Sequence, residues 1–88
     1  MFEVFLTSRA ERDLKVFPQN LRPKFYALLE SLEFNYFPDY QDVKKLKGAE
    51  NSYRVRFGDW RVVYTVDFEK KRIFVGHILP RKIVYRKQ

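Results

Sequence analysis

Arginine recurs at every second position in one short stretch of this chain, YRVRF at 53–57. Strand side chains alternate between two faces, so Arg54 and Arg56 are expected on one face and the apolar residues on the other. Gly58-Asp59 then separates this stretch from a second β-rich run, which is typical of a two-residue hairpin. In that register Arg56 lies opposite Arg61, with Cβ atoms ~5 Å apart, where like charges destabilise a sheet. We therefore expect an external anion, and guanidinium groups suit phosphate because they bind its oxygens bidentately and stay charged.

The composition limits the chemistry that can accompany these arginines. The chain of 88 residues makes one domain, 1–88, with a single modest core. It has no cysteine and one histidine, which excludes a disulfide framework, a thiolate metal site and a multi-histidine cluster. No apolar run approaches the ~20 residues of a membrane span, and no signal-peptide pattern opens the chain. We expect a soluble cytoplasmic protein that uses no metal or cofactor.

The net charge of +7 is concentrated in the second half of the chain. Residues 1–43 hold 5 Lys or Arg against 7 Asp or Glu, whereas residues 44–88 hold 13 against 4. Such polarity indicates a polyanionic partner, and nucleic acid is favoured over a membrane because no basic amphipathic helix accompanies the charge. The alternative is a solvated basic surface that aids solubility. Lys44, Lys45 and Lys47 are expected to hold the backbone of such a nucleic acid rather than to take part in chemistry.

The residues before the arginines predict one strand and two helices. Alternating apolar residues indicate a strand over 2–7. Ser8 and Glu11 have the spacing of a capping box, and the helix that follows is expected to end before Pro18. Asn20 is expected to cap a second helix. The apolar stripe of that helix, which would pack on a sheet, comprises Leu21, Phe25, Leu28, Leu29, Leu32 and Tyr36.

The residues around and after the arginines predict mostly strands. A basic strand is expected over 43–47, a loop over 48–52 and, after the hairpin, a turn at 70–71. A last strand over 72–79 precedes a tail over 80–88. This order predicts an α+β fold: an N-terminal strand, a two-helix hairpin and an antiparallel sheet of about three further strands, with the helices on one sheet face. The opposite face would keep the arginines.

Three segments carry a resemblance to a known family: Lys45-Leu46-Lys47-Gly48, the hairpin from Tyr53 to Tyr64, and Pro80-Arg81 with Tyr85. Together they resemble the RelE branch of the RelE/ParE toxin superfamily, and the archaeal RelE proteins in particular. The resemblance implies a toxin of a type II toxin–antitoxin pair that enters the ribosomal A site and cuts mRNA there. The implied reaction is metal-independent attack of a ribose 2′-hydroxyl on the adjacent phosphate. The implied partners are the ribosome, mRNA and a cognate RelB-like antitoxin.

The resemblance also assigns roles to individual residues. Arg61 matches the strand arginine that contacts the scissile phosphate. Arg81 matches the C-terminal arginine, for which we favour transition-state stabilisation over proton donation because of its high intrinsic pKa. Tyr85 matches the tyrosine that stacks on the RNA base and is a candidate general base. A phenol with a pKa near ~10 serves as a base at neutral pH only where positive charge favours the phenolate.

Two departures from the family pattern restrict the transfer of these roles. Arg54 and Arg56 stand where the family has lysines, which leaves an electrostatic role but no lysine proton transfer. Pro80 stands where many relatives carry histidine, so a histidine base at that position is excluded. His77 lies three residues earlier, where a lone histidine is more often structural than catalytic.

Other readings stay open at this point. Arg61 could pair with Asp59 and Arg54 with Glu50, although surface ion pairs contribute little to stability. Tyr85 could cover an apolar edge. For the whole protein, the alternatives are a ParE-like inhibitor of DNA gyrase without nuclease activity, and an RNA- or ribosome-binding module that catalyses no reaction.

Overall fold

A computed structural model describes residues 1–38 and 42–80 of the chain. The predictions made for Arg81 and Tyr85 fall outside the described residues. The elements, in chain order, are β1 (Glu3–Leu6), α1 (Ser8–Leu14), the 3₁₀ turn η1 (Gln19–Leu21), α2 (Arg22–Phe34), β2 (Val43–Lys45), β3 (Ser52–Phe57), β4 (Trp60–Asp67) and β5 (Arg72–Pro80).

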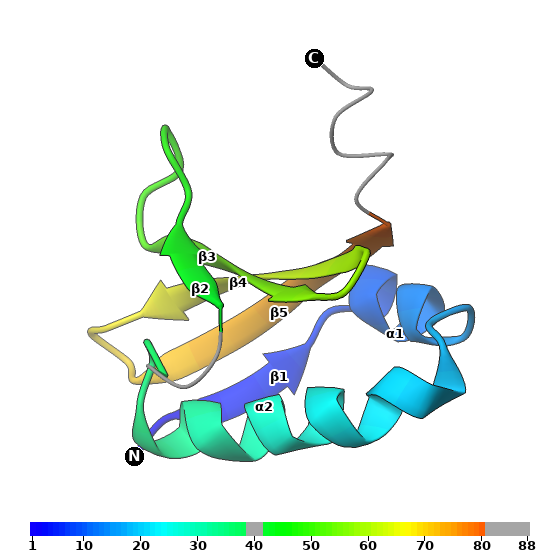
Figure 1. Ribbon diagram of the computed structural model, residues 1–88. Helices are drawn as coiled ribbons and strands as arrows, with labels where there is room; N and C mark the ends of the chain where they lie inside the picture. The colour runs from blue at the N-terminus through cyan, green and yellow to red at the C-terminus, as the bar shows by residue number, and fades with distance from the viewer. Residues whose placement is uncertain (39–41, 81–88) are drawn as a thin grey trace.

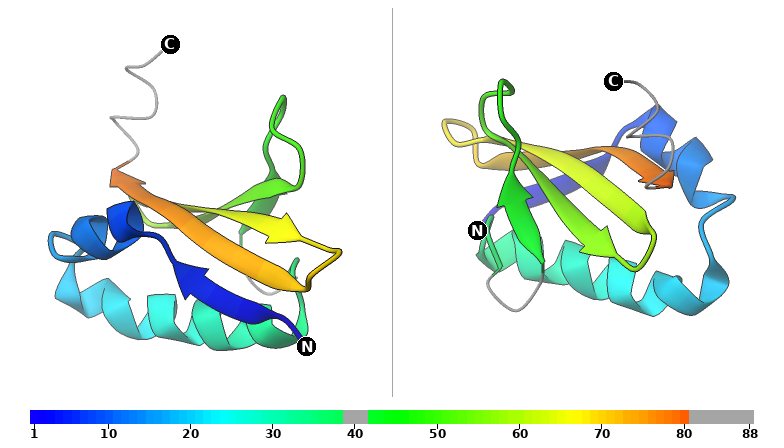
Figure 2. Two further views of the ribbon diagram at one scale, coloured as in Figure 1. Left: turned by 180° about the vertical axis from the view of Figure 1, so that it is seen from behind. Right: turned by 45° about the horizontal axis from the view of Figure 1, so that its top comes forward.

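The strands form one five-stranded sheet in the order β1-β5-β4-β3-β2. α2 runs beneath this sheet, and α1 lies at the sheet edge where β1 ends (Figure 1). Figure 2 shows from two further sides that α2 covers one face. The expected α+β fold is confirmed. The sheet is mixed, however, because β1 pairs with β5 in parallel, whereas the other neighbours are antiparallel.

Both helix starts differ from the prediction. Thr7, not Ser8, caps α1, and its Oγ1 accepts the backbone N–H of Ala10 at 3.1 Å. Asn20 does not cap α2, because it already lies within η1, which runs directly into the helix; α2 begins without a side-chain cap. α1 also ends earlier than expected, at Leu14, yet Phe17 beyond its end is buried.

The core lies between the sheet and the helices. Tyr53, Val55 and Phe57 of β3 are buried while Arg54 and Arg56 are not, as the alternation predicted. The fully or nearly fully buried apolar side chains from the other elements are Ala10, Phe17, Phe25, Leu28, Leu32, Val62, Tyr64, Val66, Ile73, Val75 and Ile78. Burial of this apolar surface supplies the main stabilising term of a domain without disulfides.

The pairing of β4 with β5 contains a bulge at Gly76. Val63 lies opposite His77, but the next residue of β4, Tyr64, lies opposite Val75. One residue of β5 is therefore extra, which reverses the alternation beyond it. As a result Ile78 is buried in the core, and His77 shares the face of Val63.

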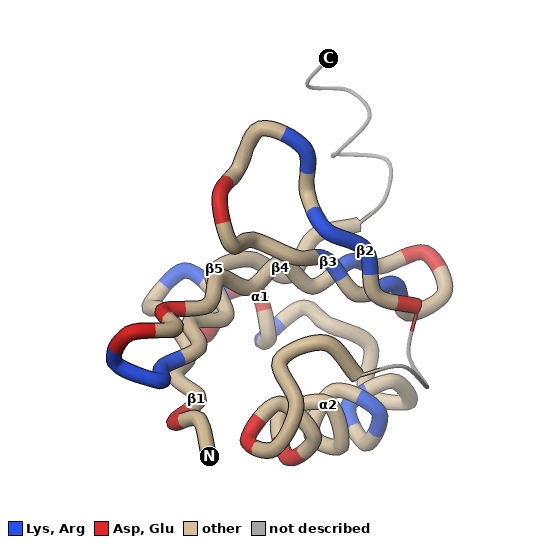
Figure 3. The backbone as a smooth tube through the Cα atoms, turned by 90° about the vertical axis from the view of Figure 1, so that its left-hand side faces the viewer, with Lys and Arg blue, Asp and Glu red and all other residues tan. Residues whose placement is uncertain are grey.

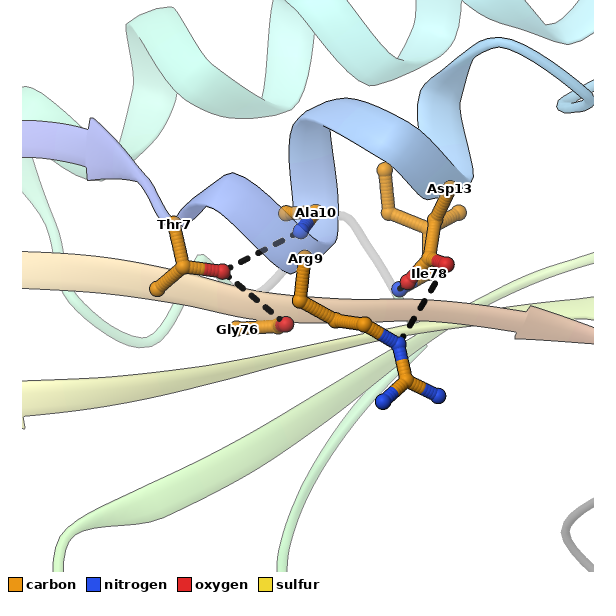
Figure 4. Close-up of polar contacts among 6 residues, drawn as sticks. All are labelled: Thr7, Arg9, Ala10, Asp13, Gly76 and Ile78. Carbon is orange, nitrogen blue, oxygen red and sulfur yellow. Dashed lines mark hydrogen bonds and ion pairs between the residues drawn. The ribbon is translucent and has the colours of Figure 1, made fainter.

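Beyond the end of β1, α1 and its N-cap residue provide hydrogen-bond partners for the backbone groups along the free edge of β5. The backbone N–H of Thr7 donates to the carbonyl of Val75 at 3.0 Å, and its hydroxyl donates to the carbonyl of Gly76 at 3.1 Å. Asp13 Oδ2 accepts the backbone N–H of Ile78 at 3.0 Å (Figure 4). Edge backbone groups need such partners, so these bonds fix the part of β5 that carries the bulge.

Candidate nucleic-acid interface

The hairpin has the predicted register. Phe57 lies opposite Trp60, and Arg56 lies opposite Arg61. Gly58 has a φ of +59°, which is favourable for glycine because it lacks a Cβ. The two arginines therefore occupy neighbouring positions on the sheet face that α2 does not cover. We call this face the open face.

Basic residues extend in two adjacent rows across the open face. One row runs from Arg56 through Arg61 to Leu79. The next row, from Lys44 through Arg54 and Val63 to His77, crosses four strands. Neighbouring strands lie ~4.8 Å apart, so the cations of both rows fall within reach of one nucleotide or its neighbours. We call Lys44, Arg54, Arg56, Arg61 and His77 the basic cluster.

Arg61 is the most enclosed cation of this cluster. Its relative exposure is 7%, whereas Arg54 is partly buried and Arg56 is exposed. A guanidinium in such a setting is screened little by solvent, which strengthens its attraction for a phosphate that reaches it. Arg61 is therefore suited to a fixed contact with an anion, and Arg56 to a more adjustable one.

Lys44, Arg54 and Arg56 of the basic cluster form no ion pair with a carboxylate of residues 1–38 and 42–80. Ion pairs in those ranges join Arg9 Nε to Asp13 Oδ1 at 3.6 Å and Arg72 Nε to Glu3 Oε1 at 3.7 Å. Arg54 forms no ion pair with Glu50, which removes that reading of Arg54. The positive field of these three residues therefore extends into solvent.

The three lysines differ in their placement. Lys44 lies opposite Arg54 and belongs to the open face. Lys45 lies opposite Tyr53, so it belongs to the other face of the edge strand β2. Lys47 follows the end of β2, which stops at Lys45 rather than at Lys47, and it is exposed. Lys and Arg gather around β2 and β3 (Figure 3). The structure thus brings one of the three into the rows.

Tyr64 is excluded from chemistry on the open face. Its ring is fully buried on the helix side, and its hydroxyl donates to the carbonyl of Tyr36 at 2.7 Å. Burial raises its pKa well above the ordinary range, and the neighbouring phenols of Tyr53 and Tyr36 raise it further. A neutral, hydrogen-bonded phenol in the core is a structural group.

His77 reaches the open face because of the bulge. Counting by two from the buried Val75 would have placed residue 77 in the core, whereas the extra residue Gly76 moves it beside Val63. Its Nδ1 is buried and has no hydrogen-bond partner within the described part of the chain. Glycine in a strand often marks a bulge, so Gly76 was the signal in the sequence that could have placed His77.

Two classes of site find no support in the described residues. Within 1–38 and 42–80, no three His, Asp or Glu side chains group where they could hold a metal ion. The helices in those ranges are all too short or too polar to cross a membrane. What the described surface offers is a cationic sheet face, which fits a phosphate-bearing ligand.

The sequence and fold of this α+β domain match those of known toxins. A family model described as the ParE toxin of the type II toxin–antitoxin system parDE matches residues 4–85. RelE1 of Methanocaldococcus jannaschii is 37% identical over 86 residues, which cover 97% of this chain and 96% of that protein. Toxin RelE3 of the same organism is 33% identical over 84% of each chain.

Solved structures agree with these sequence relatives. RelE from the archaeal RelE–RelB complex of Pyrococcus horikoshii superposes with a TM-score of 0.79 and 30% identity, covering 91% of this chain and 94% of that one. The RelB–RelE antitoxin–toxin complex of Methanococcus jannaschii gives a TM-score of 0.81 and 26% identity, covering 94% and 96%. The chain therefore belongs to the RelE/ParE toxin superfamily, and it is a RelE-family toxin of the type II toxin–antitoxin class.

Proposed function

We propose that this toxin is a ribosome-dependent mRNA endonuclease of the cytoplasm. The observation that carries the proposal is the register of the hairpin, which sets Arg56 directly opposite Arg61 on the open face. A phosphate diester at this place can accept hydrogen bonds from both guanidinium groups. The membership in the RelE family supports RNA as the source of that phosphate.

The proposed reaction is internal transfer at one phosphate of the mRNA. A base removes the proton of the ribose 2′-hydroxyl, the oxygen bonds to the adjacent phosphorus, and the bond from phosphorus to the 5′ oxygen breaks. That oxygen takes a proton, so the products are a 2′,3′-cyclic phosphate and a free 5′-hydroxyl. In the proposal, Arg61 and Arg56 stabilise the negative charge that develops on the phosphorane oxygens. Arg81 adds positive charge that favours the phenolate of Tyr85, which stacks on a base and accepts the 2′ proton.

The test is cleavage of a defined mRNA on programmed ribosomes without metal beyond what ribosomes require. Arg61→Ala is expected to lower the single-turnover rate by ~10²–10³-fold, the loss typical of one stabilising group. Arg72→Ala is the matched control, because Arg72 lies on the same sheet but pairs with Glu3 away from the basic cluster. Tyr85→Phe is expected to slow cleavage while preserving stacking. Wild-type rates in both Arg61→Ala and Tyr85→Phe would overturn the assignment, and binding without cleavage would indicate a non-catalytic module.

A second candidate is inhibition of DNA gyrase, and the observation that favours it is the match to a ParE family model over residues 4–85. A gyrase inhibitor on this fold would leave mRNA intact. It would prevent the supercoiling of relaxed plasmid by purified gyrase. The same protein preparation can be used in both assays, and we expect mRNA cleavage with normal supercoiling.

We also propose a RelB-like antitoxin as the protein partner. Solved RelE relatives form complexes with RelB, and the open face of this chain would attract an acidic segment. Co-expression with the adjacent open reading frame is expected to restore growth of cells that make the toxin. Growth that is indifferent to that gene would count against the pairing.

A further inference from the structure

Two phenylalanines form a stacked pair on the open face. Phe5 of β1 lies beside Phe74 of β5 in the parallel register. Their ring centroids are 5.6 Å apart with an interplanar angle of 21°. Both rings are exposed, 41% for Phe5 and 38% for Phe74. Large apolar side chains on a strand normally face the core, so this pair places unpartnered aromatic surface in solvent.

The pair continues the same face as the basic cluster. Phe74 lies opposite Thr65, and Thr65 opposite Ser52. Along β4, Thr65 is four residues from Arg61, which at ~3.3 Å per residue is roughly 13 Å. The row of Arg54 and His77 lies between them. A short extended single strand of nucleic acid can span that distance while its backbone follows the cations.

From this placement we infer that Phe5 and Phe74 form a base-stacking subsite for a nucleotide a few positions from the phosphate held at Arg61. The inference rests on the proposed RNA ligand, because it extends the same interface. Aromatic rings beside a cationic track are the general means by which proteins hold single-stranded nucleic acid. The subsite would add affinity without reading base identity, since every base has a π-face.

The surroundings of the rings favour a nucleotide over a protein. On one side lie the hydroxyls of Ser52 and Thr65, hydrogen-bonded to each other at 2.9 Å. On the other side, Glu3 and Arg72 form an ion pair; each lies two residues before one of the phenylalanines on the same strand. Polar groups thus border the pair, and two rings that are each less than half exposed offer far less apolar surface than the ~800 Å² per partner of stable protein interfaces.

The experiment measures the affinity of the full-length toxin for short single-stranded oligoribonucleotides of two lengths. A dinucleotide diphosphate contacts the basic cluster alone. An oligonucleotide of about six nucleotides also reaches the rings of Phe5 and Phe74. For wild type the longer RNA is expected to bind at least tenfold more tightly. We call the ratio of the two affinities the length increment. In Phe5→Leu/Phe74→Leu the length increment is expected to fall by about tenfold, while the affinity for the dinucleotide stays unchanged.

Three controls separate stacking from other effects. Phe34→Leu removes an exposed ring, 72% exposed, on α2 and is expected to change neither affinity. Phe5→Tyr/Phe74→Tyr keeps the aromatic faces and is expected to retain the increment. The slope of log K against log salt is expected to match wild type in the leucine variant, because stacking releases no counterions, and to fall by ~0.7 in Arg54→Ala. Thermal melts verify that the leucine variant is folded.

A length increment that survives in the folded leucine variant would overturn the inference. So would loss of antitoxin binding with unchanged RNA affinity, because the pair would then be a protein-docking surface. Failure of the proposed function gives a different result: no cleavage on ribosomes by wild type, which leaves the two-length comparison intact. The inference is supported only if the increment depends on the aromatic rings and the arginines set the salt dependence.

Discussion

At the scale of single residues, Arg56 and Arg61 differ in what they can contribute. Arg61 is 7% exposed, so its attraction for an anion is strong and its position is fixed by neighbours. Arg56 is exposed, and its Nε donates weakly to the carbonyl of Gly58 at 3.5 Å. Solvent screens Arg56, which lessens but does not remove the unfavourable effect of a like charge on the opposite strand. The two residues thus differ in how firmly each can hold an anion.

Replacing Arg56 by Gln is expected to stabilise the free protein. The substitution removes the like charge opposite Arg61 and keeps a polar side chain, so the free energy of unfolding should rise by ~0.5 kcal/mol at low salt. Urea denaturation measures the change. Near 1 M salt the Debye length falls to ~3 Å, and the gain should largely disappear. A loss of stability at low salt would contradict the repulsion.

Tyr64→Phe should lower stability at neutral pH and lessen its dependence on alkaline pH. The variant leaves the carbonyl of Tyr36 without its donor, at a cost of ~1 kcal/mol. The pKa of Tyr64 is raised by burial in the folded state, so above the ordinary value of 10.0 the unfolded chain ionises first. Stability from this group is full below that pH and declines above it. Denaturation curves at rising pH should show the gap to wild type narrowing; a constant gap would contradict this.

At the scale of elements, α1 acts as a substitute strand at the edge of the sheet. β1 pairs with β5 only as far as Leu6 opposite Val75. From there the side chain of Thr7 donates a hydrogen bond to the carbonyl of Gly76, and the side chain of Asp13 accepts one from the N–H of Ile78. This contact lies just where the bulge turns His77 to the open face. The position of the helix therefore bears on the geometry of the site through β5.

Asp13→Ala should destabilise the protein by ~1–3 kcal/mol, because it leaves the part-buried N–H of Ile78 without an acceptor. Asp13→Asn keeps an acceptor oxygen and should lose less than half of that. Arg9→Ala is the control for the ion pair, which is half exposed at Arg9 and should contribute ~0–0.5 kcal/mol. Urea denaturation of the three variants gives the order. Equal losses in Asp13→Ala and Asp13→Asn would show that charge, not the hydrogen bond, matters.

The order of the elements and the register of the hairpin were predictable from the sequence, whereas the exact helix ends and the non-local strand pairing were not. The register of Arg56 with Arg61 follows from a two-residue loop and strict alternation, which are local signals. The parallel pairing of β1 with β5 joins segments about seventy residues apart, and no local pattern encodes it. Thr7 caps α1 in place of the predicted Ser8. Either hydroxyl can accept a backbone N–H, but that of Thr7 also donates to the carbonyl of Gly76.

The candidate site was predictable to the same degree. The face of Arg54 and Arg56 was set by alternation, whereas the face of His77 depended on a bulge that one glycine only suggests. The exposed pair of Phe5 and Phe74 depends on the non-local pairing, so the sequence gives no sign that the rings meet. Arg81 and Tyr85 stay predictions.

At the scale of the whole molecule, positive charge is concentrated in the segment that forms most of the sheet. Residues 43–80 hold 9 Lys or Arg against 4 Asp or Glu, a balance of +5, and include four of the five strands. Lys and Arg of this segment gather around β2 and β3 (Figure 3). Such polarity orients an approaching polyanion toward the open face before any contact forms, and it makes association faster at low salt.

A single-stranded polyanion should therefore raise the melting temperature of the free toxin. A ligand present at about 100 times its Kd adds ~2.7 kcal/mol, and each kcal/mol shifts the melting temperature of a domain this size by ~4–8 °C. Poly(U) at low salt is thus expected to raise it by ~10–20 °C. Differential scanning calorimetry measures the shift. The shift should vanish near 1 M salt and shrink in Arg61→Ala but not in Arg72→Ala, whose guanidinium lies away from the basic cluster. Equal shifts in the two variants would mean that the net charge of the chain, rather than the arrangement of the basic cluster, holds the RNA.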